Sequence, residues 1–166
     1  MGHVWLIGLM GSGKNTIGSR LAERTGLPFY DVDAEVEEDY GRSVSDIFFM
    51  EGEDAFRAME AGAIDRIAGR PDGVVATGGG SILVEDNVSR MREAGSVVLL
   101  DVDAATAAER ITDTESRPLL AGDALEGLSD ILTDRIAAYR AAAEIVVNAN
   151  DGVEGVVDRV MEACAM

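Results

Sequence analysis

The chain has 166 residues, the length of one ordinary domain and enough to bury a hydrophobic core. Its 14 basic and 31 acidic residues give a formal net charge of −17, and so acidic a surface repels nucleic acid and anionic membranes. The single cysteine, Cys164, excludes an internal disulfide framework. No stretch has the pattern of a signal peptide or the length of a membrane span. We therefore expect one cytoplasmic globular domain, with neither nucleic acid nor a membrane as partner.

Short apolar stretches alternate with helical patterns, which is typical of a layered α/β domain with a mostly parallel sheet. A first helix is expected at residues 14–25, ended by Gly26 and Pro28. Two further helices are expected late in the chain. Five strands are predicted at residues 4–8, 29–31, 74–77, 97–101 and 145–148, and the late helices at about 128–140 and 152–163.

Two segments interrupt this alternation. Residues 34–69 form a long helical insertion between the second and third strands, broken by Gly41 and Gly52. Residues 113–124 include "TESRPLLAGDA", a polar stretch with little helical periodicity, and we expect a mobile loop there.

The stretch "GLMGSGKNT" satisfies a phosphate-binding loop of the form G-x-x-x-x-G-K-[ST] at Gly8, Gly13 and Lys14. It follows a buried strand and opens a helix, which is the context that this motif requires. Glycines bring backbone N–H groups close to phosphate oxygens, and the helix N-terminus and Lys14 add positive charge. Lys14 is also the only lysine of the chain. The loop therefore predicts a nucleotide site.

The residue after Lys14 should carry a hydroxyl for magnesium, and here it is Asn15, followed by Thr16. The amide offers a carbonyl oxygen, an acceptable hard ligand on a longer side chain, so weaker metal binding is one interpretation. The other is that Asn15 merely begins the helix while water fills the metal position. The sequence leaves both open.

The stretch "YDVD" places Asp31 and Asp33 two residues apart at the end of the second strand. On an extended segment the two side chains point the same way, and ligands of open parallel sheets bind at this end of the strands. One carboxylate could hold Mg²⁺ through water while the other accepts a substrate proton. Alternatively, Asp33 caps the following helix. The stretch "TGGGS", with Gly78, Gly79 and Gly80, follows the third strand and favours a binding wall.

Arginines supply the remaining candidates. Arg57 lies on a helical face with Glu53 and Glu60, which can orient its guanidinium. Arg135 falls on the apolar stripe of its helix, seven residues after Leu128, so its charge needs an anionic partner, either an internal carboxylate or a ligand. Arg117 in the 113–124 loop could neutralise a transferring phosphoryl group, or it could be solvated. Arg110 could flank a base or face solvent.

Together, "GLMGSGKNTIG", "YDVD", "GRSVSDIF", "EGEDAFR", "TGGGS", "RPLL" and "RIAAYR" resemble the shikimate kinases over nearly the whole chain. The resemblance implies a P-loop NTP hydrolase-like fold: three α/β/α layers, a five-stranded parallel sheet, a substrate-binding insertion at 34–69 and a lid at 113–124. It implies phosphoryl transfer from ATP to the 3-hydroxyl of shikimate, with Mg²⁺ as cofactor, in aromatic amino acid biosynthesis. A family member of this size can work as a monomer.

The resemblance also implies a role for each candidate residue. Asp33 would be the base, Lys14 and Arg117 would act on the phosphates, and Asn15 and Asp31 would hold Mg²⁺. The residues implied to bind ATP are Gly11, Ser12, Gly13, Lys14, Asn15, Thr16, Arg110 and Arg117, and those implied to bind shikimate are Asp33, Phe48, Phe56, Arg57, Gly78, Gly79, Gly80 and Arg135.

Two departures from the family pattern are Asn15 and Ala138, which stands where the family often shows proline. Two alternative functions therefore remain at this point. One is a related small-molecule kinase, such as a gluconate kinase. The other is a nucleotide-binding homologue whose catalysis is impaired by Asn15.

Overall fold

The structure is a computed structural model that describes residues 2–111 and 123–166. Its strands form one parallel sheet in the order β2-β3-β1-β4-β5. The strands are β1 (His3–Ile7), β2 (Phe29–Asp31), β3 (Val74–Ala76), β4 (Gly95–Asp101) and β5 (Ile145–Asn148). The predicted five-stranded parallel sheet is confirmed, with strand ends that differ from the predicted ones by at most two residues.

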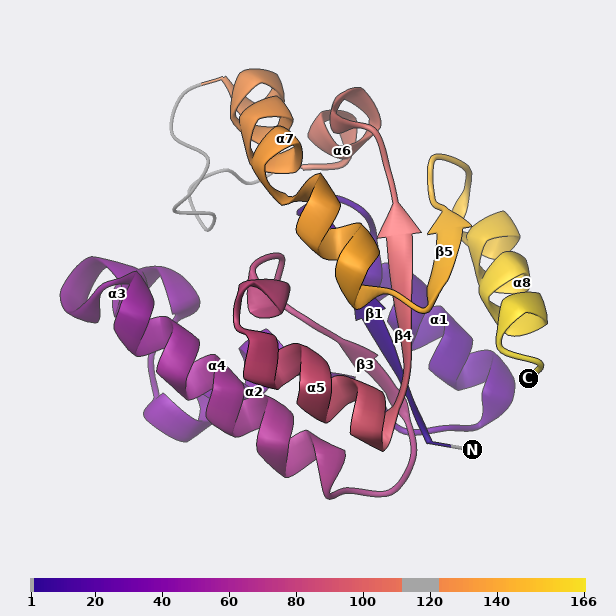
Figure 1. Cartoon of the computed structure of the whole chain (residues 1–166), viewed down its shortest axis with the longest axis horizontal. Helices are drawn as coiled ribbons and strands as arrows, with labels where there is room; N and C mark the ends of the chain where they lie inside the picture. Colours follow the sequence, from indigo (N-terminus) through magenta and orange to yellow (C-terminus); the bar gives the residue numbers. More distant parts are fainter. Residues whose placement is uncertain (1, 112–122) are drawn as a thin grey trace.

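Helices connect these strands (Figure 1). They are α1 (Lys14–Thr25), α2 (Val32–Tyr40), α3 (Val44–Glu51), α4 (Glu53–Ala68), the short 3₁₀ helix η1 (Ser81–Leu83), α5 (Glu85–Ala94), α6 (Ala104–Arg110), α7 (Ala124–Ala142) and α8 (Val153–Ala163). The predicted break points are correct, because Gly41 ends α2 with a left-handed φ of 64° and Gly52 ends α3. Helix α5 was not predicted, because its sequence is largely polar.

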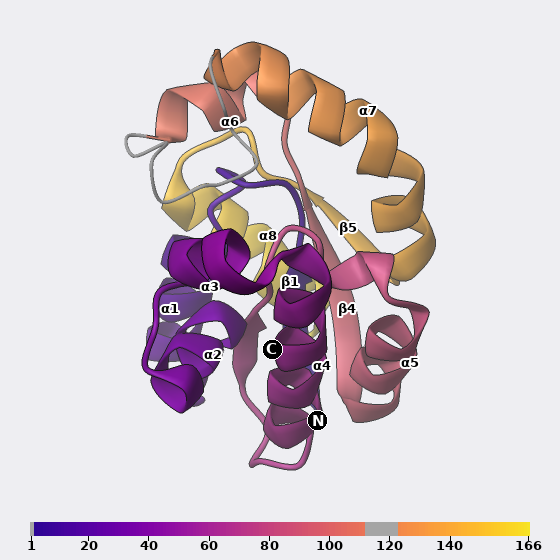
Figure 2. The same cartoon turned by 90° about the vertical axis from the view of Figure 1, so that its left-hand side faces the viewer.

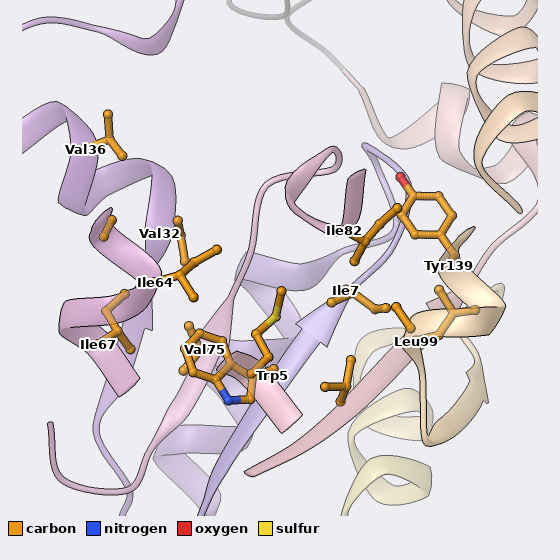
Figure 3. Close-up of a cluster of buried hydrophobic side chains, with 14 of the residues drawn as sticks. Trp5, Ile7, Val32, Val36, Ile64, Ile67, Val75, Ile82, Leu99 and Tyr139 are labelled. Atoms are coloured by element: carbon orange, nitrogen blue, oxygen red, sulfur yellow. The ribbon is translucent and has the colours of Figure 1, made fainter. Parts of the chain in front are cut away.

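The strand side chains alternate between two hydrophobic layers. Trp5, Ile7 and Val75 face a cluster formed with α2, α3, α4, α5 and α7 (Figure 3). Val4 and Leu6 face a second cluster, formed with α1 and α8. Figures 1 and 2 show the two groups of helices on opposite sides of the sheet. The predicted three-layer α/β/α arrangement is therefore confirmed.

The loops that follow the strands gather at one edge of the sheet, because all the strands run in the same direction. Three segments lie at this edge: residues 8–13 after β1, the start of α2 after β2, and residues 77–80 after β3. Of the predicted lid, only residues 123 and 124 belong to the described part of the chain. Among the described helices, none combines the length and the apolar composition needed to cross a membrane.

Candidate active site

The glycine loop between β1 and α1 has the backbone shape that phosphate binding requires. Gly11 has a φ of +79°, and a Cβ there would lie 2.5 Å from the carbonyl oxygen of Ala107, so only glycine fits. The Lys14 ammonium donates hydrogen bonds to the carbonyl oxygens of Gly8 (2.8 Å) and Leu9 (3.1 Å). The lysine therefore lies over its own loop, next to the N-terminus of α1.

A cavity of about 480 Å³ opens in front of this loop. Lys14, Asn15, Asp33 and Arg110 all line it. Loop residues, helix residues and the glycine triplet complete the lining, with Met10, Gly11, Gly13, Thr16, Ile17, Thr77, Gly78, Gly79, Ile111, Asp151 and Val153. A phosphate-binding loop and a carboxylate that could accept a proton thus face the same space.

The local structure of "YDVD" differs from the predicted one. Asp31 ends β2 and caps α2, because its Oδ1 accepts hydrogen bonds from the backbone N–H groups of Asp33 (2.9 Å) and Ala34 (3.2 Å). Asp33 therefore lies in the first turn of α2, and the two carboxylates do not share one extended segment. The capping role considered for Asp33 belongs to Asp31.

The carboxyl group of Asp33 is electrostatically unusual. Burial, together with the nearby carboxylates of Glu60 and Asp31, raises its pKa to about 7, and the charge of Lys14 opposes this rise. Its Oδ1 is shielded from solvent and has no hydrogen-bond partner among residues 2–111 and 123–166. A general base works best when its pKa lies near the working pH, so this carboxyl group suits proton abstraction from a hydroxyl in the cavity.

Asn15 and Asp31, the two residues predicted to hold a metal ion, lie together. The Asn15 side-chain amide donates a 2.5 Å hydrogen bond to Asp31 Oδ2. Because an ionised carboxylate only accepts hydrogen bonds, the amide nitrogen faces Asp31 and the carbonyl oxygen faces away from it. Both Asp31 oxygens accept hydrogen bonds in this arrangement, so a cation such as Mg²⁺ would be held by these two residues only after the Asn15 amide turned its carbonyl oxygen toward the site. The described residues contain no cluster of three or more acidic, histidine or cysteine ligands, so phosphate oxygens and water would complete the coordination.

Arg57 is oriented by its own helix. Its guanidinium donates to Glu60 Oε2 (2.9 Å) and Glu53 Oε1 (3.3 Å), as the spacing of these residues predicted. It lies 6.0 Å from the ring centre of Phe48 and 5.3 Å from that of Phe56. These contacts bring the three predicted residues together, although none of them lines the cavity.

Glu60 forms a second contact that its spacing from Arg57 did not predict. It is fully buried and accepts a 2.5 Å hydrogen bond from the Ser81 hydroxyl, in addition to its ion pair with Arg57. Gly80 lies directly against the Arg57 guanidinium, which occupies the position that a Cβ would take. Glu60 therefore ties Arg57 to the segment that follows the glycine triplet.

Arg135 is 8% exposed on the buried face of α7. No carboxylate in residues 2–111 or 123–166 forms an ion pair with it, so the internal partner considered from the sequence is not seen in this part of the chain. Tyr139 lies one helical turn after Arg135 on the same buried face. Burial raises the pKa of Tyr139, whereas the charges of Arg135 and Arg57 oppose this rise. Both positive charges therefore lie near the Tyr139 hydroxyl.

Of the two arginines predicted to lie near the phosphates, only Arg110 belongs to the described residues. Arg110 donates to the carbonyl oxygens of Ser12 (3.4 Å) and Asp151 (3.0 Å), and so it connects the glycine loop to the loop after β5. The predicted place of Arg110 beside a base stays a prediction. Arg117 lies outside the described residues.

Comparisons with known proteins agree with this geometry. A family model described as shikimate kinase matches residues 10–165. The shikimate kinase of Symbiobacterium thermophilum is 41% identical over 164 residues, covering 96% of this chain and 94% of that protein. That of Halorhodospira halophila is 40% identical over 163 residues, covering 97% of this chain and 92% of that protein.

Solved structures give the same result. The shikimate kinase from Acinetobacter baumannii in complex with shikimate superposes with a TM-score of 0.93 at 32% identity, covering 98% of this chain and 92% of that chain. A gluconokinase from Sinorhizobium meliloti reaches a TM-score of only 0.63 at 22% identity, covering 99% of this chain and 91% of that chain, which is a likeness of fold alone. The chain belongs to the shikimate kinase family.

Proposed function

We propose that the protein transfers the γ-phosphate of ATP to the 3-hydroxyl of shikimate, a step of aromatic amino acid biosynthesis. The observation that carries this proposal is the shared cavity, in which the Asp33 carboxyl group faces the Lys14 loop. In phosphoryl transfer most of the catalysis comes from positioning and charge stabilisation, so a base and a phosphate cradle in one space are the essential parts.

On the donor side, the backbone N–H groups of residues 11–16 and the Lys14 ammonium bind the phosphates of ATP. For this, Lys14 exchanges the carbonyl oxygens of Gly8 and Leu9 for phosphate oxygens. Arg110 lies beside the adenine. We propose Arg117 as the further cation that reaches the transferring phosphate, and residues 113–124 as the lid that closes over it.

On the acceptor side, the Asp33 carboxyl group, which lines the cavity, accepts the proton of the attacking hydroxyl. Arg57 and Arg135 bind the shikimate carboxylate, and residues 34–69 supply this part of the pocket. Phe48 and Phe56 pack beside Arg57. Arg135 is the stronger argument for an anionic acceptor, because its buried charge has no carboxylate partner in the described structure.

Kinases of this kind generally need a divalent metal, and we propose Mg²⁺. Asn15, through its carbonyl oxygen, and Asp31, through water, would hold the ion together with phosphate oxygens. When bound, the ion neutralises charge on the β- and γ-phosphates. We propose further that the enzyme works as a cytoplasmic monomer on two small substrates. Size-exclusion chromatography with light scattering measures the molar mass in solution and so tests whether the protein is a monomer.

A coupled assay of ADP release tests the proposal. Shikimate-dependent ADP release with Mg²⁺ or Mn²⁺ is expected, and gluconate in place of shikimate is expected to give none. Release with gluconate alone would instead support the related small-molecule kinase. A protein that binds ATP in calorimetry but releases no ADP with either metal would support the homologue with impaired catalysis.

Replacing Asn15 by Ser is expected to lower the Mg²⁺ concentration needed for half-maximal activity several-fold. A compact hydroxyl reaches octahedral geometry more easily than an amide, and Mg²⁺ tolerates poor geometry badly. Titration of Mg²⁺ in the coupled assay, and of Mn²⁺ by electron paramagnetic resonance with the non-hydrolysable ATP analogue present, measure the change. The KM for shikimate should stay the same and acts as the internal control. An unchanged Mg²⁺ requirement would remove Asn15 from the metal site.

Replacing Gly80 by Ala is expected to raise the KM for shikimate about tenfold, the equivalent of roughly 1.4 kcal/mol. Gly80 has a φ of −108°, which alanine also adopts, so the backbone is not strained. The new methyl group instead displaces the Arg57 guanidinium. The KM for ATP should not change. Gly62→Ala is the matched control, since a Cβ there meets only the Arg66 guanidinium, at 3.4 Å.

A further inference from the structure

Tyr139 belongs to the hydrophobic layer but forms a polar contact at its margin. It is 1% exposed, and its ring packs in the cluster that contains Ile7, Ile82 and Leu99. Figure 3 shows the ring within this cluster and the hydroxyl oxygen at its margin. The ring and the hydroxyl therefore meet different surroundings.

The Tyr139 hydroxyl donates a 2.5 Å hydrogen bond to the carbonyl oxygen of Gly79, across 60 residues of sequence. Gly79 lines the cavity and lies close to Met10 of the glycine loop, since a Cβ on Gly79 would be 3.5 Å from the Met10 side chain. Arg135 lies one helical turn earlier on the same buried face of α7, and its charge opposes the rise in the pKa of this hydroxyl. The hydroxyl thus lies near Arg135 and is bonded to the wall of the cavity.

This connection matters because Arg135 is a long side chain with many rotamers and no carboxylate partner in the described part of the chain. A hydroxyl that lies one helical turn from Arg135 and is itself fixed on a backbone carbonyl restricts where the guanidinium can lie. We propose that Tyr139 is a positioning residue, which sets the place of Arg135 for the carboxylate of the acceptor. The proposal rests on the function proposed above and adds a residue to it.

The packing of the core does not require this hydroxyl. A phenylalanine ring fills the same volume in the cluster, and burying a hydroxyl is unfavourable unless it forms a hydrogen bond. The bond is made to Gly79, which also lies close to the donor loop at Met10. The position of the hydroxyl therefore indicates a role in the site, which packing of the core does not explain.

The test compares wild type and Tyr139→Phe with two acceptors, shikimate and its methyl ester, which lacks the negative charge. For shikimate, the KM of the variant is expected to rise about tenfold, the effect of one misplaced charged contact, with kcat and the KM for ATP within about twofold. For the ester, the KM is expected to change by less than about twofold, so the preference for the acid over the ester falls about tenfold. Loss of general pocket structure would raise both KM values alike.

Tyr30→Phe is the matched control. The Tyr30 hydroxyl also donates to a backbone carbonyl, that of Pro71 (3.1 Å), but it does so beyond the amino end of β3, away from the cavity. This variant is expected to have the kinetics of wild type, and thermal melts of both variants confirm folding.

A second comparison adds Tyr139→Phe to Arg135→Met. If Tyr139 acts through Arg135, the double variant should have the same KM for shikimate as Arg135→Met alone. Additive effects, an unchanged KM in Tyr139→Phe, or equal changes for acid and ester would each overturn the proposal. A wild type without shikimate-dependent ADP release would overturn the proposed function itself, and the positioning role with it.

Discussion

Replacement of Asp33 by Asn is expected to lower kcat by about 10²–10⁴-fold, the usual contribution of a positioned general base. The amide keeps the size of the carboxyl group and its hydrogen-bonding reach, but it cannot accept the proton of the attacking hydroxyl. The KM values for ATP and shikimate should change much less than kcat. The coupled assay of ADP release measures both parameters.

The same replacement is expected to stabilise the folded protein above neutral pH. The pKa of Asp33 is about 7 in the folded state and about 3.9 in an unfolded chain. The unfolded chain therefore loses this proton first as pH rises, and the wild type loses stability between about pH 4 and pH 7. A difference of about three pKa units corresponds to roughly 4 kcal/mol at most. Asp33→Asn carries no such penalty.

Urea unfolding of wild type and Asp33→Asn at pH 4.5 and pH 8 measures this difference. The free energies of unfolding should lie close together at the lower pH, and the variant should be more stable at the higher pH. Asp130→Asn, an exposed aspartate on α7, is the control and should change neither stability nor rate. If Asp33→Asn had the stability of wild type at pH 8, the carboxyl group would not be desolvated as the structure indicates.

Replacement of Arg135 by Met is expected to raise the KM for shikimate by about 30- to 1,000-fold, corresponding to about 2–4 kcal/mol for a buried charge pair that loses one partner. Methionine fills most of the volume of the arginine stem but carries no charge. Because no carboxylate of the described residues pairs with Arg135, the free energy of unfolding should stay the same or increase. The KM for ATP should be unaffected.

The free energy of unfolding of Arg135→Met shows whether Arg135 pairs with an internal carboxylate or is kept for a ligand. A loss of about 3–5 kcal/mol on replacement would reveal an internal ion pair, because it would leave a buried carboxylate without its partner. Arg140→Met is the matched control on the same helix. Its side chain is 65% exposed and lies 3.9 Å from Asp101, so neither KM nor stability should change appreciably.

The fold and the family could be predicted from the sequence because their signals are local. A buried strand, a glycine loop and a helix lie in one continuous stretch, and the glycines at 41 and 52 end helices through their own backbone conformation. The relation between Asp31 and Asp33 was predicted wrongly. Whether a carboxylate ends a strand or begins a helix depends on which backbone N–H groups it meets, and residue spacing does not specify this.

The contacts that organise the acceptor side could not be predicted, because they join distant segments. The bond from Tyr139 to Gly79 crosses 60 residues, and the bond from Ser81 to Glu60 crosses 21. Periodicity placed Arg135 on the buried face of its helix, which is correct, but it could not show which groups this side chain meets there. The proposed roles of the site residues, including Arg117, stay predictions until the variants are measured.

The burial of Trp5 has a practical consequence for all of these measurements. It is the only tryptophan of the chain, it is fully buried in the middle of the sheet, and it does not line the cavity. Its fluorescence should therefore report whether the hydrophobic layer is intact and should respond little to the occupancy of the site. A red shift of its emission during unfolding distinguishes a variant that has lost its fold from one that has lost only its chemistry.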